Sequence, residues 1–124
     1  MKNVFNVLIA AVILFFSSCI KEGPGGKASI KGTVMHHSKL IPGSVVYIKY
    51  GATDSPGSNV TYYDASVNAD VNAYFEFTDL KRGDYYLFGV GYDSSIVQDL
   101  SGGVPIKIKS KTEVIETVVP VTEP

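Results

Sequence analysis

The sequence predicts an all-β domain, built either as a sandwich or as a barrel. From Ala28 onward, apolar residues recur with the period of two that marks one face of a strand, and not with the 3.6-residue period of a helix. Turn-forming residues interrupt these runs at regular intervals. The chain has 124 residues and a single cysteine, so an intramolecular disulfide is excluded. We therefore expect one domain that is held together by packing alone.

The first predicted strand begins at Ala28 and has one apolar face, which consists of Ala28, Ile30, Gly32 and Val34. Pro42-Gly43 forms a turn into a second strand, 44–50, which alternates in the same way. The segment 51–59, GATDSPGSN, holds almost only turn formers. We expect it to be a mobile surface loop that could carry recognition.

Five further strands bring the predicted total to seven: 60–67, 74–78, 84–92, 104–109 and 113–121. The short link 68–73 predicts a hairpin, and the link 110–112 predicts that the last two strands pair.

In that last pair, Lys107 and Lys109 would lie opposite Glu113 and Glu116. Such charge pairs contribute about 0.2–1 kcal/mol each and mainly set the register. A lysine stripe also protects a strand edge from aggregation, and we favour this interpretation over binding of anionic lipid headgroups.

The first eighteen residues have the layout of a secretory signal: Lys2, the apolar segment 4–16, and then Ser17-Ser18 before Cys19. A transmembrane helix is disfavoured, because the apolar segment would cover only about 20 Å of a hydrocarbon core that is about 30 Å thick.

The residues Phe16-Ser17-Ser18-Cys19 resemble a bacterial lipobox. The resemblance implies cleavage before Cys19 and lipid attachment to its thiol and new amino group; the alternative is an ordinary signal with a stray cysteine. Residues 19–27 would then be a lipidated cysteine followed by a flexible, Gly-rich and Pro-rich tether. Lys21-Glu22 is similar to the export signal of Bacteroidetes lipoproteins, which implies anchoring in the cell outer membrane, either periplasmic or surface-exposed.

Two stretches, IPGSVVYI (41–48) and ADVNAYFEFTDLKRGDYYL (69–87), resemble the carboxypeptidase regulatory-like domain. This resemblance implies a prealbumin-like (transthyretin-like) seven-stranded antiparallel β-sandwich with a Greek key, here spanning 28–121 before a short tail, 122–124. Ala73 stands where the family usually has a turn glycine. The family is typically a non-catalytic accessory module, and transthyretin-like hydrolases end in a Tyr-Arg-Gly-Ser segment that this chain lacks.

Several chemistries are disfavoured. Eleven basic against twelve acidic residues, without a basic stripe, argue against a nucleic-acid partner. His36 and His37 are neighbours on a predicted strand, where their side chains would point to opposite faces and could not readily share a metal. Asp70-Val71-Asn72 lacks the glycine and glutamate of an EF-hand. No nucleophile motif is present, so we expect no enzyme, metal or cofactor.

The candidate binding face lies on strand 84–92, which is apolar on both faces. In a two-layer sandwich one face of such a strand should be exposed to solvent and polar. The proposed face consists of Tyr86, Phe88 and Tyr92 from this strand, together with Tyr47 and Tyr50 from strand 44–50. Either a loop or a terminal segment covers this face, or it is an exposed patch of the kind that binds partners. The leading hypothesis is a lipid-anchored envelope module that binds a protein or a glycan. The alternatives are a structural or assembly subunit and, less favoured, a small hydrolase.

Overall fold

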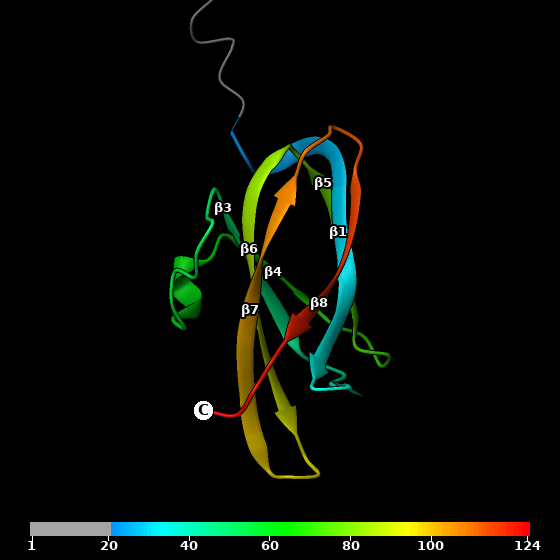
Figure 1. Ribbon diagram of the computed structural model, residues 1–124, viewed down its shortest axis with the longest axis vertical. Coiled ribbons are helices and arrows are strands. Elements are labelled where there is room, and N and C mark those ends of the chain that lie inside the picture. Colours follow the sequence, from blue (N-terminus) through cyan, green and yellow to red (C-terminus); the bar gives the residue numbers. More distant parts are fainter. Residues whose placement is uncertain (1–20) are drawn as a thin grey trace, which may run out of the picture.

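The computed structural model describes residues 21–124, which form two β-sheets packed face to face as a sandwich (Figure 1). The predicted signal, 1–18, and Cys19 lie outside the described residues. Within the described part, no helix has the length and apolar character needed to cross a membrane. The predicted all-β class is confirmed.

In the first sheet, β1 (Pro24–His36) is the central strand. It pairs antiparallel with β5 (Tyr74–Leu80) and, at its far end, with the two-residue strand β2 (Lys39–Leu40). On its other side it pairs in parallel with β8 (Val114–Pro120). This parallel pair departs from the purely antiparallel sandwich that the sequence led us to expect.

The second sheet is antiparallel throughout, in the order β4-β3-β6-β7. Its strands are β4 (Ala65–Asn68), β3 (Val45–Tyr50), β6 (Gly83–Asp93) and β7 (Gln98–Ile108). Residues 21–124 therefore form eight strands and not the predicted seven, and the short strand β2 is the one that the sequence analysis missed.

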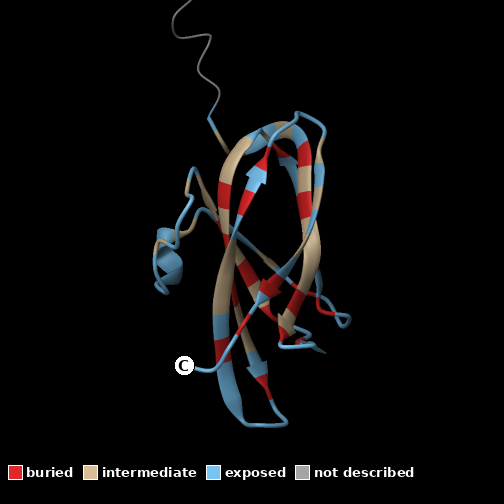
Figure 2. Cartoon of the chain, in the orientation of Figure 1, coloured by how far each residue is buried: buried red, intermediate tan, exposed pale blue. Residues whose placement is uncertain are grey.

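The core lies between the sheets, and along β3 and β5 buried residues alternate with more exposed ones (Figure 2). The predicted apolar face of β1 is confirmed, since Ala28, Ile30 and Val34 are fully buried. Among the largest buried side chains are Tyr85, Phe75, Ile30, Ile41, Ile48 and Leu87.

The predicted strand 60–67 is wrong in its first half. A 3-10 helix, η1 (Val60–Tyr62), occupies that part, and β4 begins only at Ala65. The Asn59 side chain accepts a hydrogen bond from the backbone N–H of Thr61, which caps the helix and favours a turn over an extended chain.

The predicted hairpin across 68–73 is also wrong, because β4 and β5 belong to different sheets and the link crosses between them. The carboxylate of Asp70 organises the crossing by accepting hydrogen bonds from the backbone N–H groups of Asn72 and Tyr74. Ala73 is left-handed there, with a φ of 61°, at the position where the sequence resemblance led us to expect a turn glycine.

The last two strands do not pair with each other either. β7 lies in the second sheet and β8 in the first. Lys107 therefore lies opposite Asp84 of β6, and Glu116 lies opposite Lys31 of β1, with 3.4 Å between the charged atoms of the latter pair. Beyond β8, backbone hydrogen bonds between Thr122 and Ser101 of β7 connect the two sheets.

The start of β1 is anchored more firmly than the sequence suggested. β1 begins at Pro24 and not at Ala28, so the second half of the segment predicted as a tether belongs to the first sheet. Just before it, the buried hydroxyl of Tyr85 accepts a hydrogen bond from the backbone N–H of Gly23, at 2.9 Å, and donates one to the carbonyl of Lys81, at 2.7 Å. Burial raises the pKa of Tyr85.

We expect Tyr85→Phe to lower the free energy of unfolding by about 1–3 kcal/mol, because the amide of Gly23 and the carbonyl of Lys81 would lose their buried partner. Urea denaturation measures the change, and hydrogen exchange at the Gly23 amide locates it. Tyr74→Phe is the control, since that hydroxyl bonds Glu76 on the surface. Equal unfolding midpoints for the two variants would show that the buried hydroxyl does not stabilise the fold.

Candidate functional site

The predicted binding residues divide between the two faces of the second sheet. Tyr47 on β3 shares the outer face with Phe88 of β6. Tyr50 does not, because it lies on the inner face with Val46 and Ile48, where its ring meets that of Tyr85 edge-on at 5.9 Å. Its assignment to the outer face was wrong, since residues 47 and 50 are an odd number of positions apart on one strand.

Phe88, at the centre of the outer face, is covered. Only 6% of it is exposed, and the ring of Tyr63 stacks on it with 5.5 Å between ring centroids and 15° between ring planes. The ring of Tyr47 lies 6.5 Å away. Of the two explanations for the apolar outer face, cover by a loop therefore applies at this position.

The covering segment is the loop 51–64, which is fixed at both of its ends. At its C-terminal end, the carboxylate of Asp64 accepts a hydrogen bond from the backbone N–H of Tyr50 at 2.7 Å. Within the loop, the hydroxyl of Tyr63 donates to the carbonyl of Gly57 at 2.8 Å. These bonds hold η1 beside the second sheet, as Figure 1 shows.

The tyrosines around Phe88 keep part of their surface in solvent. Tyr47, Tyr63 and Tyr86 are half-buried, and we call these three the tyrosine surface. The ring of Tyr86 lies over Gly103 of β7, where any Cβ atom would collide with it. Tyr92 is farther along β6 and 51% exposed. Flat, partly wetted rings of this kind can stack against a ligand and offer a hydroxyl at the rim.

A second feature is a basic end, where β1 begins and the β5–β6 and β7–β8 turns meet (Figure 1). Two shallow grooves there share Arg82. Their basic residues, which define the basic end, are Lys27, Lys81, Arg82, Lys107, Lys109 and Lys111. Within residues 21–124 none of them forms an ion pair with a carboxylate.

The third feature, which the sequence analysis missed, lies at the other end of β1. The positive φ of His37, 56°, interrupts the alternation expected of a strand. The rings of His36 and His37 therefore lie side by side, with 4.5 Å between centroids, and not on opposite faces. The prediction that the two histidines point to opposite faces and cannot share a metal is therefore wrong in its premise.

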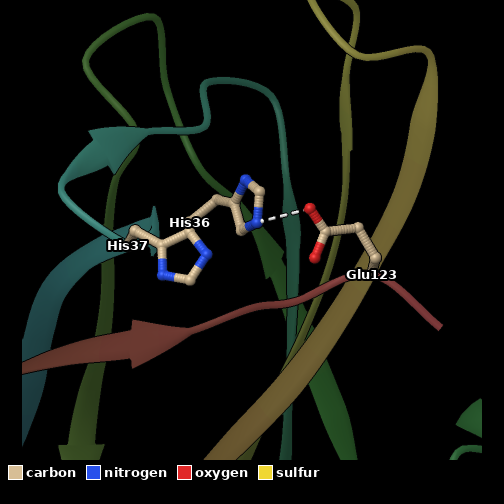
Figure 3. A group of neighbouring side chains, drawn as sticks. All are labelled: His36, His37 and Glu123. Atoms are coloured by element: carbon tan, nitrogen blue, oxygen red, sulfur yellow. Dashed lines mark ion pairs between the residues drawn. The ribbon is translucent and has the colours of Figure 1, made fainter.

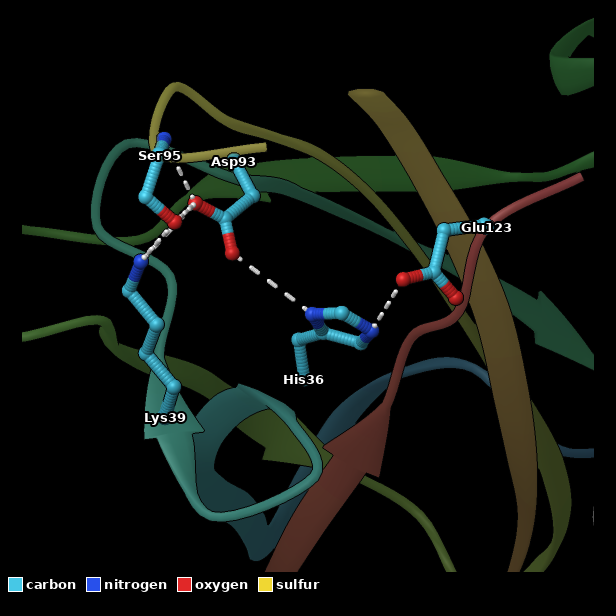
Figure 4. Close-up of polar contacts among 5 residues, drawn as sticks. All are labelled: His36, Lys39, Asp93, Ser95 and Glu123. Carbon is cyan, nitrogen blue, oxygen red and sulfur yellow. Dashed lines mark hydrogen bonds and ion pairs between the residues drawn. The ribbon is translucent and has the colours of Figure 1, made fainter. Parts of the chain in front are cut away.

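Two carboxylates flank His36, which is 8% exposed. Its Nε2 atom lies 3.0 Å from a carboxylate oxygen of Glu123, and its Nδ1 atom lies 3.6 Å from one of Asp93 (Figure 4). The ammonium of Lys39 and then the hydroxyl of Ser95 hydrogen-bond Asp93 and hold its pKa well below the usual range. Asp93 is therefore an anion at neutral pH.

Comparisons with known proteins establish the fold and not the family. No family model matches the chain, and no curated protein matches it. Among solved structures, BcpA, the major pilin subunit of Bacillus cereus, matches with a TM-score of 0.52 and 14% identity, over 79% of this chain and 30% of the pilin chain. This chain thus spans less than a third of the length of BcpA.

A candidate carbohydrate-binding protein from Pseudomonas aeruginosa matches with a TM-score of 0.55 and 12% identity, over 85% of this chain and 93% of that protein. Both neighbours are β-sandwich proteins, which agrees with the sandwich expected from the sequence. At these identities the comparisons carry no residue-level assignment.

Proposed function

We propose that the protein is a non-catalytic binding module of the bacterial cell envelope, anchored by lipid at Cys19, which engages a glycan or a protein through the tyrosine surface. The tyrosine surface is the observation that carries this proposal. Three half-buried rings converge on one outer face, beyond what a two-layer sandwich needs for its core.

The shape of the tyrosine surface favours binding over a purely structural role. The ring of Tyr63 stacks on Phe88, and the ring of Tyr86 occupies the space beside Gly103 that a side chain would otherwise fill. Side chains that are fixed before a ligand arrives lose little conformational entropy on binding. Tyrosine hydroxyls at the rim can hydrogen-bond sugar hydroxyls or a peptide backbone.

The position of the basic end supports anchoring at Cys19. Gly23 is fixed by Tyr85, so only three residues separate it from Cys19, and the four Cα–Cα steps between the two residues can span about 14 Å at most. A lipid at Cys19 would therefore hold the basic end near the headgroups, where positive charge is favourable beside anionic lipid. The second half of the segment predicted as a tether adds no reach, because it belongs to β1.

The anchor is tested by metabolic labelling with palmitate. We expect label in the native chain and none in Cys19→Ala. Label that persists in the variant would refute lipid attachment at this residue. It would not bear on binding by the tyrosine surface, which is tested separately.

Binding is tested with a glycan array and with photo-crosslinking from position 92 on intact cells. We expect saturable binding that Tyr86→Ala and Tyr47→Ala each weaken by about tenfold or more, as at interface hot spots. Tyr74→Ala is the matched control, because Tyr74 lies on the first sheet and is 37% exposed. Absence of saturable binding in both assays, or equal binding by all variants, would overturn the proposal.

One observation favours the alternative, an assembly subunit. Within residues 21–124, β8 pairs only with β1, which leaves an open strand edge where Val114 and Val118 are 55% and 45% exposed. An open edge can accept a strand from another chain. Assembly predicts concentration-dependent oligomers in detergent, measured by light scattering, whereas the binding module remains monomeric until its partner is added.

A further inference from the structure

The cluster of His36, His37 and Glu123 has no part in the proposed function, and its chemistry points elsewhere. One potential ligand atom from each residue lies within 4.8 Å of the others (Figure 3). The three residues come from the end of β1, the turn that follows it and the chain beyond β8. We propose that they form a binding site for a divalent transition-metal ion, with Zn²⁺ as the expected ion.

The buried Nε2 atom of His36 is the first argument. Within the described residues it has no hydrogen-bond partner. The Glu123 oxygen is only 3.0 Å away but does not meet hydrogen-bond geometry, so the short contact leaves the nitrogen unsatisfied. A buried polar atom without a partner is costly, and a metal ion that uses its lone pair would remove that cost.

The spacing is the second argument. Two ligands of one tetrahedral zinc ion lie about 3.3 Å apart, because each is about 2.0–2.1 Å from the metal. The separation of Nε2 and the Glu123 oxygen is already close to this value. His37 and Glu123 are exposed, so their side chains can rotate the short distance that remains without disturbing the core.

The orientation of His36 is the third argument. Metal-binding histidines commonly direct their other ring nitrogen toward a carboxylate, which fixes the ring and its tautomer. Asp93 occupies that position, 3.6 Å from Nδ1. Asp93 is itself held by Lys39 at 2.8 Å and by the hydroxyl of Ser95 at 2.6 Å (Figure 4). In this arrangement Nδ1 is the nitrogen that would keep its proton on metal binding, and Nε2, which faces Glu123, is the one that would bind the ion.

The backbone of His37 is the fourth argument. A left-handed φ is uncommon for a residue other than glycine and costs about 1–2 kcal/mol. Here it turns the second imidazole to the side of the first. The strained conformation therefore creates the histidine pair that a regular strand would prevent.

The donor set selects the kind of metal. Two imidazole nitrogens and one carboxylate oxygen suit Zn²⁺, Cu²⁺ or Ni²⁺, whereas Ca²⁺ and Mg²⁺ prefer oxygen donors alone. Three protein ligands would leave a further coordination position for water or for a group from another molecule.

The competing explanation is a metal-free ion pair, in which a charged His36 lies between Asp93 and Glu123. The two explanations differ at His37, because the ion pair needs His36 and the two carboxylates but gives the second histidine no role. His37→Ala is therefore the decisive variant.

The test is calorimetric titration of the purified protein with Zn²⁺, using a preparation without a polyhistidine tag. We expect one ion per chain, and affinity reduced by tenfold or more in both His37→Ala and Glu123→Gln. Glu116→Gln is the matched control, since this exposed glutamate lies on β8 and forms an ion pair with Lys31, away from the two histidines. Thermal unfolding without metal should be the same for His37→Ala and the native chain, which separates lost ligation from lost folding.

Titration with Co²⁺ provides a second readout. A site with imidazole ligands and fewer than six donors should give intense visible absorption that Zn²⁺ removes and that His37→Ala abolishes. The proposal is overturned if Zn²⁺ binding is not saturable, or if binding in His37→Ala and Glu123→Gln equals that of the native chain. Neither result would bear on the tyrosine surface.

Discussion

Gly32→Ala is expected to destabilise the domain by about 3 kcal/mol or more, which is a large share of the 5–15 kcal/mol that holds a typical domain together. Gly32 lies on β1 opposite Thr117 of β8. A Cβ atom at residue 32 would overlap the carbonyl oxygen and carbon of Thr117. Because the obstructing atoms are backbone, the two strands would have to separate, and no side chain could move aside instead.

Urea denaturation followed by circular dichroism measures this loss. Gly89→Ala is the control, because the new methyl group would meet side-chain methyl groups of Val119 and Val121 at 3.0 and 3.1 Å, and these can shift. We expect the control to cost about 1 kcal/mol, at the lower end of overpacking. Similar losses for the two alanine variants would mean that β8 is not held against β1 in the way described.

Phe88→Ala is the second change with a large expected effect, about 3 kcal/mol, at the lower end of values for buried phenylalanines because its cover is a loop. Removal of the ring also removes the platform on which Tyr63 stacks. The loop 51–64 should then become more accessible, and limited proteolysis should cleave it earlier than in the native chain.

The comparison for this change is Tyr92→Ala on the same strand and face, where the side chain is 51% exposed. That variant should unfold at nearly the native urea concentration and keep the loop protected. If Phe88→Ala left both stability and loop cleavage unchanged, the stacking of Tyr63 on Phe88 would have no structural role. Phe88 is for the same reason a poor probe of ligand binding, since its substitution would disturb the fold first.

The faces of individual strands could be predicted from the sequence because alternation is a local property. Ala28, Ile30 and Val34 are buried as expected, and so are Phe75 and Phe77. The same rule would have placed Tyr50 with Ile48 and not with Tyr47, so that error came from grouping tyrosines by type. The sequence left open whether the outer face of strand 84–92 is covered or exposed, so the cover of Phe88 by Tyr63 was one of two alternatives.

The partners of the strands could not be read in the same way. The links 68–73 and 110–112 are short enough for hairpins, yet both cross from one sheet to the other. A short link does not determine whether the two strands that it joins pair with each other or lie in different sheets. That depends on which sheet can bury the apolar face of each strand. β1 and β8 are the first and the last strand in the sequence, so no local sequence pattern predicts their parallel pairing.

The histidine pair was missed for a different reason. Alternation holds only while the backbone stays extended, and His37 leaves the extended region. The sequence offered one hint, the turn-forming residue Ser38 directly after the two histidines and before the short strand β2. Glu123 could not be associated with it, since residues 36 and 123 meet only through the pairing of β8 with β1.

The parallel pairing of β1 and β8 also determines how the domain responds to force. Tension applied between the start of β1 and the end of β8 pulls these neighbouring strands in opposite directions along their length. The hydrogen bonds from the Ser29–Val114 pair to the Met35–Pro120 pair then share the load in shear and must break together, not one after another. When pulled from these two ends, the domain would carry tension through its longest-range strand pair, where resistance depends on the unfolding rate and not on equilibrium stability.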